Sequence, residues 1–334
     1  MKRAVIRQMI NKGCARWLPE VRADSNESLA MARQLEYIIT KVYEYKYAEA
    51  IGRSLMPTRT DVPSGAKSYT YRITDQVGSA KIIDSYADDL PLVNVRGEEQ
   101  SSLIQGIGDA FFVSIQDIRA AAMAGIDIDA VMGTTARKII ERTHDQIIAY
   151  GSPAYKLSGF ATNANVLADS LVTGGSTAGL LGAWLTNTAA QILQDIEFLS
   201  RIIYKQSTGV WGDPDTGTAV DLVLSQTLWS VVASKRLDQY NQITIGDYVK
   251  AGRIPFLRSI RGWARLNTAG GDGNSRVVGY VNSDEVLSVV VPQEFEMLPM
   301  QIKNMGYEIP CHMRTGGVQV IYPAAMFYAD HLEN

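Results

Sequence analysis

This chain of 334 residues contains few cysteines and few histidines, and neither sign of charge is in large excess. Its two cysteines, Cys14 and Cys311, are too few for a disulfide framework and are typical of a protein made in a reducing cytoplasm. The 32 basic and 35 acidic side chains nearly cancel, whereas a dedicated nucleic-acid binder normally carries a strong basic excess. The composition therefore argues against a secreted disulfide scaffold and against a dedicated nucleic-acid-binding protein.

Long hydrophobic runs are also missing. The first 22 residues are basic but contain no continuous apolar stretch, so they do not resemble a signal peptide. The longest uncharged run, residues 170–193, is too rich in Gly, Ser, Thr and Asn for a membrane span. Apolar residues nevertheless make up 46% of the chain, which is enough for a folded protein of one large or two ordinary domains. We expect no contact with a membrane.

The stretch that looks most like catalytic machinery is "IIERTHDQIIAYGSP", residues 139–153. On a helix the side chains of adjacent residues diverge by about 100°, so His144 and Asp145 cannot pair with each other. Arg137 with Glu141, and Arg142 with Asp145, stand at helix-pairing spacings. The pattern favours the polar face of a long helix, turned to solvent or to a neighbouring subunit, over an acid–base cluster.

Other candidate sites are weak. Asp215, Thr216 and Gly217 form the tripeptide of aspartic proteases, but that chemistry needs two such carboxylates and the chain has one copy, within a turn-like segment. Cys311 and His312 lack the further ligands of a zinc site, so we expect Cys311 to be buried in a strand. The sequence predicts no catalytic residue, no metal and no cofactor. A hydrolase that uses Asp215 or His144 is the alternative from another class.

The first third of the chain predicts a helix and a hairpin. Asp24 and Glu27 have capping-box spacing ahead of a helix expected to run to about residue 51. Apolar and polar residues then alternate over 63–75, a turn is expected at 76–80, and residues 81–86 are expected to run back. Such a ribbon is only marginally stable alone, so we expect it to lie on another subunit. Its candidate interface residues are Lys67, Tyr69, Tyr71, Arg72 and Lys81.

A long helix is predicted next. Gly125 interrupts a helical stretch, Asp127 can cap a second helix, and Gly151 can end it after Tyr150, about 35 Å further on. Its expected apolar stripe comprises Ile128, Val131, Met132, Thr135, Ile139, Ile147 and Tyr150. The second half has an α/β pattern, with helices at 189–206 and 226–237 and strands at 219–225, 276–282, 286–292 and 317–323.

This order of parts resembles the major capsid proteins of tailed bacteriophages with the Hong Kong 97-type fold, which encapsulin shells share. The segments that carry the likeness are "YADDLPLVNVRGEEQ" (86–100), "FFVSIQDIRAAAMAG" (111–125), "HDQIIAYGSPAYKLSGFATN" (144–163) and "GGVQVIYPAAMFYADHL" (316–332). The resemblance implies an α+β fold with an N-terminal arm, an extended β-hairpin loop, a peripheral domain with a long spine helix, and an α/β axial domain.

The resemblance also implies domain bounds. They are 1–55 for the arm and its helix, 56–107 for the extended loop, 108–157 for the peripheral domain with the spine helix, 158–291 for the axial domain, and 292–334 for return strands of the peripheral domain.

The function that the resemblance implies is structural and not enzymatic. The chain would self-assemble, as hexamers and pentamers, into the icosahedral shell that encloses a phage genome, and it would belong to the virion after assembly in the bacterial host cytoplasm. Expected partners are a cement or decoration protein, a portal, a separate scaffold and nearby packaged double-stranded DNA. An encapsulin-type compartment is the alternative with the same fold. No motif nominates partners for a covalent cross-link between subunits.

Overall fold

The structure, a computed structural model, describes residues 48–81, 92–125, 127–168, 184, 187–237, 243–270, 273 and 275–331. The helix expected over residues 24–51 lies outside the described residues except for its last four. Those four, 48–51, are not helical. A short helix, α3 (Gly52–Leu55), follows them.

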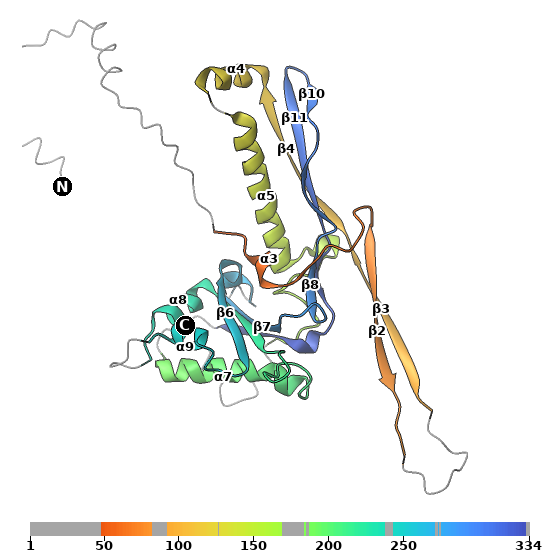
Figure 1. Cartoon of the computed structure of the whole chain (residues 1–334), viewed down its shortest axis with the longest axis vertical. Coiled ribbons are helices and arrows are strands. Elements are labelled where there is room, and N and C mark those ends of the chain that lie inside the picture. Colours follow the sequence, from red (N-terminus) through yellow and green to blue (C-terminus); the bar gives the residue numbers. More distant parts are fainter. Residues whose placement is uncertain are drawn as a thin grey trace, which may run out of the picture. The chain divides into compact units, whose positions relative to one another are not determined.

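The predicted hairpin is present as a two-stranded ribbon. Strand β2 (Ser68–Val77) pairs antiparallel with β3 (Asn94–Leu103) along its whole length. In Figure 1 the ribbon, drawn in orange, extends away from the sheets that its ends join. The predicted turn at 76–80 is wrong, because Val77 still pairs with Asn94 and the return strand begins there rather than at residue 81. Residues 82–86 of the expected return lie outside the described part of the chain.

Two helices follow strand β4 (Gln105–Ser114), and their ends are where the sequence predicts them. Helix α4 (Ile115–Ala124) ends at Gly125, which has a left-handed φ of 70°. Helix α5 (Ile128–Tyr150) begins after Asp127, whose carboxylate accepts a hydrogen bond from the N–H of Ala130. It has 23 residues and is therefore about 35 Å long. The break, the cap and the length of the spine helix are confirmed.

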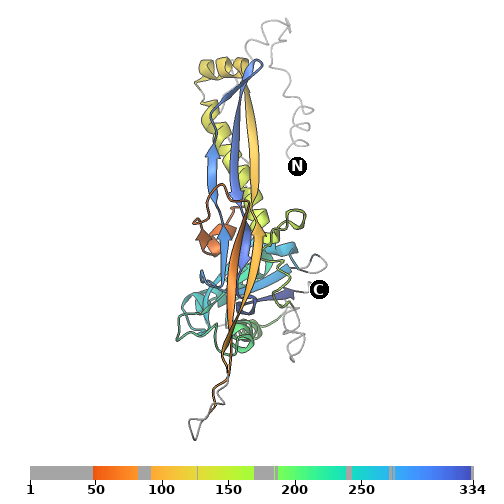
Figure 2. The ribbon, with the colours of Figure 1, turned by 90° about the vertical axis from the view of Figure 1, so that its right-hand side faces the viewer.

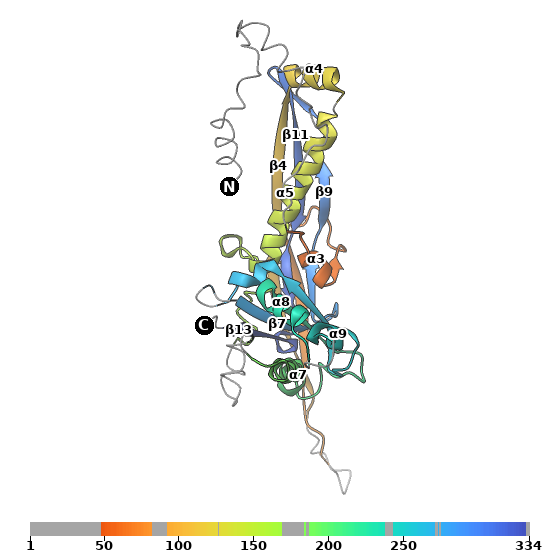
Figure 3. The ribbon, with the colours of Figure 1, turned by 90° about the vertical axis from the view of Figure 1, so that its left-hand side faces the viewer.

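Helix α5 lies along a four-stranded antiparallel sheet, here called the spine sheet. Strand β11 (Gly306–Thr315) is central and pairs with β4 on one side, and with β9 (Gln293–Met297) and β10 (Gln301–Lys303) on the other. Figures 2 and 3 show α5 alongside β4 and β11, and residue contacts link the helix to both strands and to β9. The C-terminal strands thus return to cover the spine helix.

The buried face of α5 is not the predicted one. Its buried residues are Gly133, Ala136, Ile140, His144, Asp145, Ile148 and Ala149. Val131, Met132 and Ile139, which belong to the predicted stripe, are exposed by 53%, 39% and 43%. Small residues bring the helix axis close to the sheet: a Cβ added at Gly133 would lie 3.2 Å from the Met297 sulfur. The larger apolar side chains of Val131, Met132 and Ile139, on the adjacent face of the helix, remain exposed.

A second sheet has the α/β character that the sequence predicts. Its strand order is β13 (Met326–His331), β7 (Ser275–Val281), β5 (Val220–Ser225) and β6 (Leu257–Trp263). Strand β5 runs parallel to β6 and antiparallel to β7. All six residues of β5 are buried, because helices and loops cover both of its faces.

Helices pack around this sheet. Helix α7 (Ala189–Gln206) contacts β5, β7 and β13. Helix α8 (Gln226–Ser234) follows β5 directly, with α9 (Ile245–Lys250) beside it, and both contact β6. The short 3₁₀ helix η4 (Ala264–Thr268) contacts β5, β7 and the end of α5.

Strand β13 departs from the predicted domain scheme. The sequence places residues 292–334 together as return strands of the peripheral domain. Strands β9 and β10 both pair with β11, which pairs with β4, but β13 pairs with β7 in the α/β sheet. The chain therefore crosses back before it ends, through the 3₁₀ helix η6 (Pro323–Ala325).

A small sheet joins these parts. Strand β8 (Leu287–Val290) pairs antiparallel with β12 (Gly317–Val320) and parallel with the two-residue strand β1 (Thr58–Arg59). A 3₁₀ turn, η2 (Pro153–Tyr155), follows α5.

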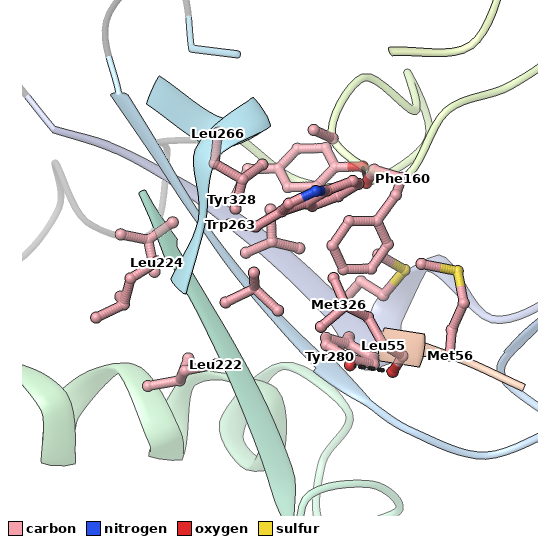
Figure 4. Packing of buried hydrophobic residues seen from close by; sticks show 14 of the residues in the cluster. Leu55, Met56, Phe160, Leu222, Leu224, Trp263, Leu266, Tyr280, Met326 and Tyr328 are labelled. Atoms are coloured by element: carbon pink, nitrogen blue, oxygen red, sulfur yellow. Dashed lines mark hydrogen bonds between the residues drawn. The ribbon is translucent and has the colours of Figure 1, made fainter. Parts of the chain in front are cut away.

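One continuous core runs from α5 into the α/β sheet. Figure 4 shows its centre, where Phe160, Trp263 and Tyr280 pack around Leu55 and Met326. The Phe160 and Tyr280 rings meet edge-to-face, with centroids 5.1 Å apart. Because Leu55 comes from α3, the last residues of the predicted arm segment 1–55 are part of this core.

Candidate functional site: assembly surfaces and the α3 junction

The ribbon is the first candidate assembly surface. Both strands are largely exposed, and only alternate residues near the ribbon's root are half-buried: Tyr69, Tyr71, Ile73, Gln100 and Ser102. Arg72 lies on the opposite face, where its Nε donates to Glu99 at 2.6 Å across the two strands. Among the residues that the structure describes, few cover the ribbon beyond its root.

Two of the five predicted interface residues fasten the ribbon to its own subunit. The Tyr71 hydroxyl lies 2.6 Å from Gln100 Oε1 and 3.3 Å from the carbonyl oxygen of Val320 in β12. The Tyr69 ring lies against Gly316, where an added Cβ would be 2.8 Å from Cε1. Burial raises the pKa of Tyr69 to about 12. Contact with a neighbour through these two rings stays a prediction.

The other three ribbon candidates have exposed side chains. Lys67 precedes β2, and its carbonyl accepts a hydrogen bond from the N–H of Ile104. Arg72 is on the ribbon, and Lys81 lies past the end of β2 in the long connection. Their exposure distinguishes these three residues from the half-buried Tyr69 and Tyr71.

The predicted polar face of the spine helix divides into two parts. Arg137 and Glu141 form an exposed ion pair with 2.8 Å between Nε and Oε1, as their spacing indicates. Arg142 is half-buried, and its carbonyl oxygen is 3.4 Å from an Arg265 guanidinium nitrogen. His144 and Asp145 are buried, with 3% and 4% exposure, so their predicted place on a solvated or subunit-facing surface is wrong. At its C-terminal end α5 is covered on a second side, by α3 and η4.

Asp145 is a buried junction between three elements. Its Oδ1 accepts the backbone N–H of Gly52 at 2.9 Å, and its Oδ2 accepts Arg265 Nε at 3.0 Å. Gly52 is required by close approach, because an added Cβ would lie 2.8 Å from the Trp263 ring and 2.9 Å from Asp145 Oδ1. The carboxylate that the sequence suggested as a partner for Arg142 instead links α5, α3 and η4.

Further contacts make α3 the meeting point of the spine sheet and the α/β sheet. We call Gly52–Leu55 with these partners the α3 junction. Arg53 forms a bidentate ion pair with Glu294 of β9, with 2.7 Å between Nη1 and Oε2. The carbonyl of Leu55 accepts hydrogen bonds from the Tyr280 hydroxyl and, at 3.0 Å, from Asn282 Nδ2. Sequence reasoning missed this junction, since its partners lie between 93 and 241 positions away.

His144 lies beside the junction. Its Nε2 is 3.2 Å from Thr315 Oγ1, and the side chain lines a cavity of about 200 Å³ together with Arg53, Glu141 and Glu294. Burial, and then the positive charge of Arg53, lower the pKa of His144 to about 4. The imidazole is therefore neutral at pH 7 and belongs to the packing between α5 and β11.

The other residues that the sequence suggested for catalysis or metal binding lie in a turn and in a strand. Asp215 lies in an exposed turn, where its N–H donates to Asp213 Oδ1 at 3.1 Å and Gly217 has a φ of 75°. Cys311 is buried in β11, as predicted, and burial raises the pKa of its thiol. Across the described residues, no group of three or more His, Cys, Asp or Glu side chains is arranged to hold a metal ion. No described helix is both long and apolar enough to cross a membrane.

This α+β fold matches phage capsid structures of the Hong Kong 97 type over about 90% of the chain. The capsid of Myoviridae phage XM1 is similar over 90% of this chain and 98% of that one, at 14% identity and a TM-score of 0.74. The capsid of cyanophage P-SCSP1u is similar over 90% and 93%, at 13% identity and a TM-score of 0.59.

A virus-like particle from Pyrococcus furiosus is similar over 83% of this chain and 90% of that one, at 13% identity and a TM-score of 0.50. The major capsid protein family matches residues 78–332. The chain belongs to that family and has the α+β Hong Kong 97-type fold. It is a structural subunit of a phage head shell, a component of the virion and not an enzyme. A search of curated protein sequences found no match.

Proposed function

We propose that copies of this chain assemble as hexamers and pentamers into an icosahedral shell around a phage genome, each ribbon lying across a neighbouring subunit. The observation that carries the proposal is the ribbon. Ten residue pairs join β2 and β3, yet hardly any described side chain outside the ribbon covers them beyond the root. An isolated two-stranded ribbon is marginally stable in water, so a neighbour that covers it would supply the missing burial.

Domain roles follow from the same proposal. The spine sheet with α4 and α5 acts as the peripheral domain, and the α/β sheet, now including β13, acts as the axial domain that gathers around five-fold and six-fold axes. The residues expected to reach a neighbour are Lys67, Arg72 and Lys81 of the ribbon region and the exposed Arg137–Glu141 pair of the spine helix. Cement or decoration protein, portal and separate scaffold are further proposed partners.

The strand register makes a precise test of the ribbon possible. Tyr71 pairs with Gln100, so residues 72–99 can be replaced by Asn-Gly, a two-residue turn suited to hairpins. The shortened chain keeps the Tyr71 contacts at the root. It should fold with the circular dichroism and melting temperature of the parent subunit, but form no particles in negative-stain images. Particles of normal yield from the shortened chain would contradict the role of the ribbon.

The parent protein supplies the test of the function itself. Expressed alone or with phage scaffold, it should be recovered as closed particles of many subunits. A chain that stays monomeric under every assembly condition would contradict the proposal.

An encapsulin-type compartment is the second candidate, because the virus-like particle from Pyrococcus furiosus has a similar fold. Particle contents distinguish the two. Packaged double-stranded DNA indicates a phage head, whereas an enclosed enzyme indicates a compartment.

A further inference from the structure

An apolar groove opens at the far end of the spine helix, between β4, α4 and the first turns of α5. It has a volume of about 320 Å³, and its lining includes Phe112, Ala120, Ala124 and Met132. Phe112 is 51% exposed and Met132 39%. The ionisable residue in this lining is Asp117, whose carboxylate is engaged in the Ser114 capping box. The groove therefore suits an apolar side chain and offers no free charge to a ligand.

Helix α4 carries such a side chain on its outer face. Met123 is 93% exposed, the highest value among the exposed large apolar side chains of the described residues. Arg119 precedes it by four positions, so the two side chains share one helix face. An exposed methionine beside an exposed apolar groove is unusual for a surface that only meets water.

Charges of opposite sign lie on the two helices that border the groove. Arg119 of α4 is exposed and forms no salt bridge with a described residue. Asp129 is exposed in the first turn of α5. An apolar centre with complementary charges at its rim is the usual composition of a protein–protein contact.

We propose that the outer face of α4 in one copy docks on the groove of a second copy, with Met123 in the groove and Arg119 beside Asp129. One copy cannot fill its own groove in this way, because Ala120 and Ala124 of the same helix form part of the lining. The contact is therefore between two copies, and it can close around a symmetry axis. Methionine, being unbranched, can adapt to the slightly different geometries that such a contact meets in a closed shell. This inference rests on the proposed shell function.

A cross-linking experiment tests the contact directly. In a Cys14→Ser background, one population of chains carries Met123→Cys and a second, affinity-tagged population carries Met132→Cys. The two are mixed before assembly, and the particles are then oxidised mildly. We expect a disulfide between positions 123 and 132 of different chains, identified by mass spectrometry of the tagged product. Val210→Cys in place of Met132→Cys is the control, since Val210 is also exposed but lies in the loop after α7.

Charge variants give a second, independent measurement. Met123→Glu should raise the concentration needed for assembly about tenfold, because a carboxylate would enter an apolar groove. It should leave the melting temperature of the unassembled subunit unchanged, because Met123 is exposed there. Arg119→Asp should also impair assembly, and the double variant Arg119→Asp/Asp129→Arg should restore it.

The outcomes separate this inference from the proposed function. Particles that form normally but contain no 123–132 disulfide overturn the α4 contact alone. Normal assembly of Met123→Glu overturns it as well. A parent chain that never assembles overturns the proposed function and this contact with it.

Discussion

The carboxylate of Asp145, near the end of the spine helix, accepts a hydrogen bond from the backbone N–H of Gly52, 93 positions earlier in the chain. The same carboxylate pairs with Arg265 of η4, which directly follows the edge strand β6 of the α/β sheet. One buried side chain thus holds together α5, α3 and the η4 turn beside the α/β sheet. Both oxygens are satisfied, which a buried carboxylate requires.

Removing this carboxylate should destabilise the subunit strongly. Asp145→Ala leaves the Gly52 N–H and the Arg265 guanidinium without their acceptor, so we expect the free energy of unfolding to fall by about 2–4 kcal/mol. Urea unfolding of the unassembled subunit measures it. Glu141→Ala, one turn earlier, breaks an exposed pair and should cost less than about 1 kcal/mol. Equal losses for the two variants would contradict the junction role of Asp145.

The close approach at Gly52 gives a second stability prediction. In Gly52→Ala the added methyl group would meet the Trp263 ring at 2.8 Å and Asp145 Oδ1 at 2.9 Å. Overpacking of this kind costs about 1–3 kcal/mol, which thermal unfolding would detect as a lower melting temperature. Gly65→Ala is the matched control, because nothing lies within 4 Å of the added Cβ there. If both variants melt like the parent protein, the junction is looser than its contacts indicate.

The Tyr71 side chain should stabilise the root of the ribbon. Tyr71→Ala removes the contacts with Gln100 and Val320 and exposes the start of the ribbon. We expect backbone N–H groups of β2 to exchange about tenfold faster in the unassembled subunit, because local opening becomes easier. Thr74→Ala, on the other face of the same strand, is the control. Unchanged exchange in Tyr71→Ala would show that backbone pairing alone holds the ribbon.

Local signals predicted the ends of elements well. Gly125, Asp127 and Gly151 mark helix ends by backbone conformation or capping, and these depend only on near neighbours in the chain. The buried strand β5 and the helix that follows it were predictable for the same reason. The return strand β3 was not, because "NVRGEEQSSL" contains few β-branched or apolar residues and owes its extended form to β2.

Packing decided what local signals could not. The exposed Val131, Met132 and Ile139 are more apolar than the buried Gly133 and Ala136, so the sequence pattern indicated the wrong face of α5. His144 and Asp145 were expected on a polar surface because their side chains are polar. Their burial depends on Arg265 and Thr315, which are distant in sequence. The membership of β13 in the α/β sheet is likewise set by partners distant in sequence, as in the pairing of Met326 with Tyr280, 46 positions earlier.

The buried histidine should make the subunit acid-sensitive in a defined range. The pKa of His144 is about 4 in the folded subunit and 6.5 in an ordinary environment. Between these values the unfolded chain binds a proton that the folded subunit excludes. The free energy of unfolding should therefore fall as the pH is lowered from about 6.5 to about 4, by about 2–3 kcal/mol from this group, and no further below that.

A substitution isolates that contribution from those of the carboxylates. The hydrogen bond from Arg53 is the main cause that holds the pKa of Glu294 below its ordinary value of 4.5. The stability that Glu294 contributes is therefore lost below about pH 4.5, beneath most of the range in which His144 acts. His144→Gln keeps a nitrogen near Thr315 but does not titrate. Urea unfolding at several pH values should then show a flatter profile between pH 6.5 and 4 for the variant than for the parent subunit. Parallel profiles would mean that His144 is protonated in the folded subunit as readily as in the unfolded chain, in conflict with its burial beside Arg53.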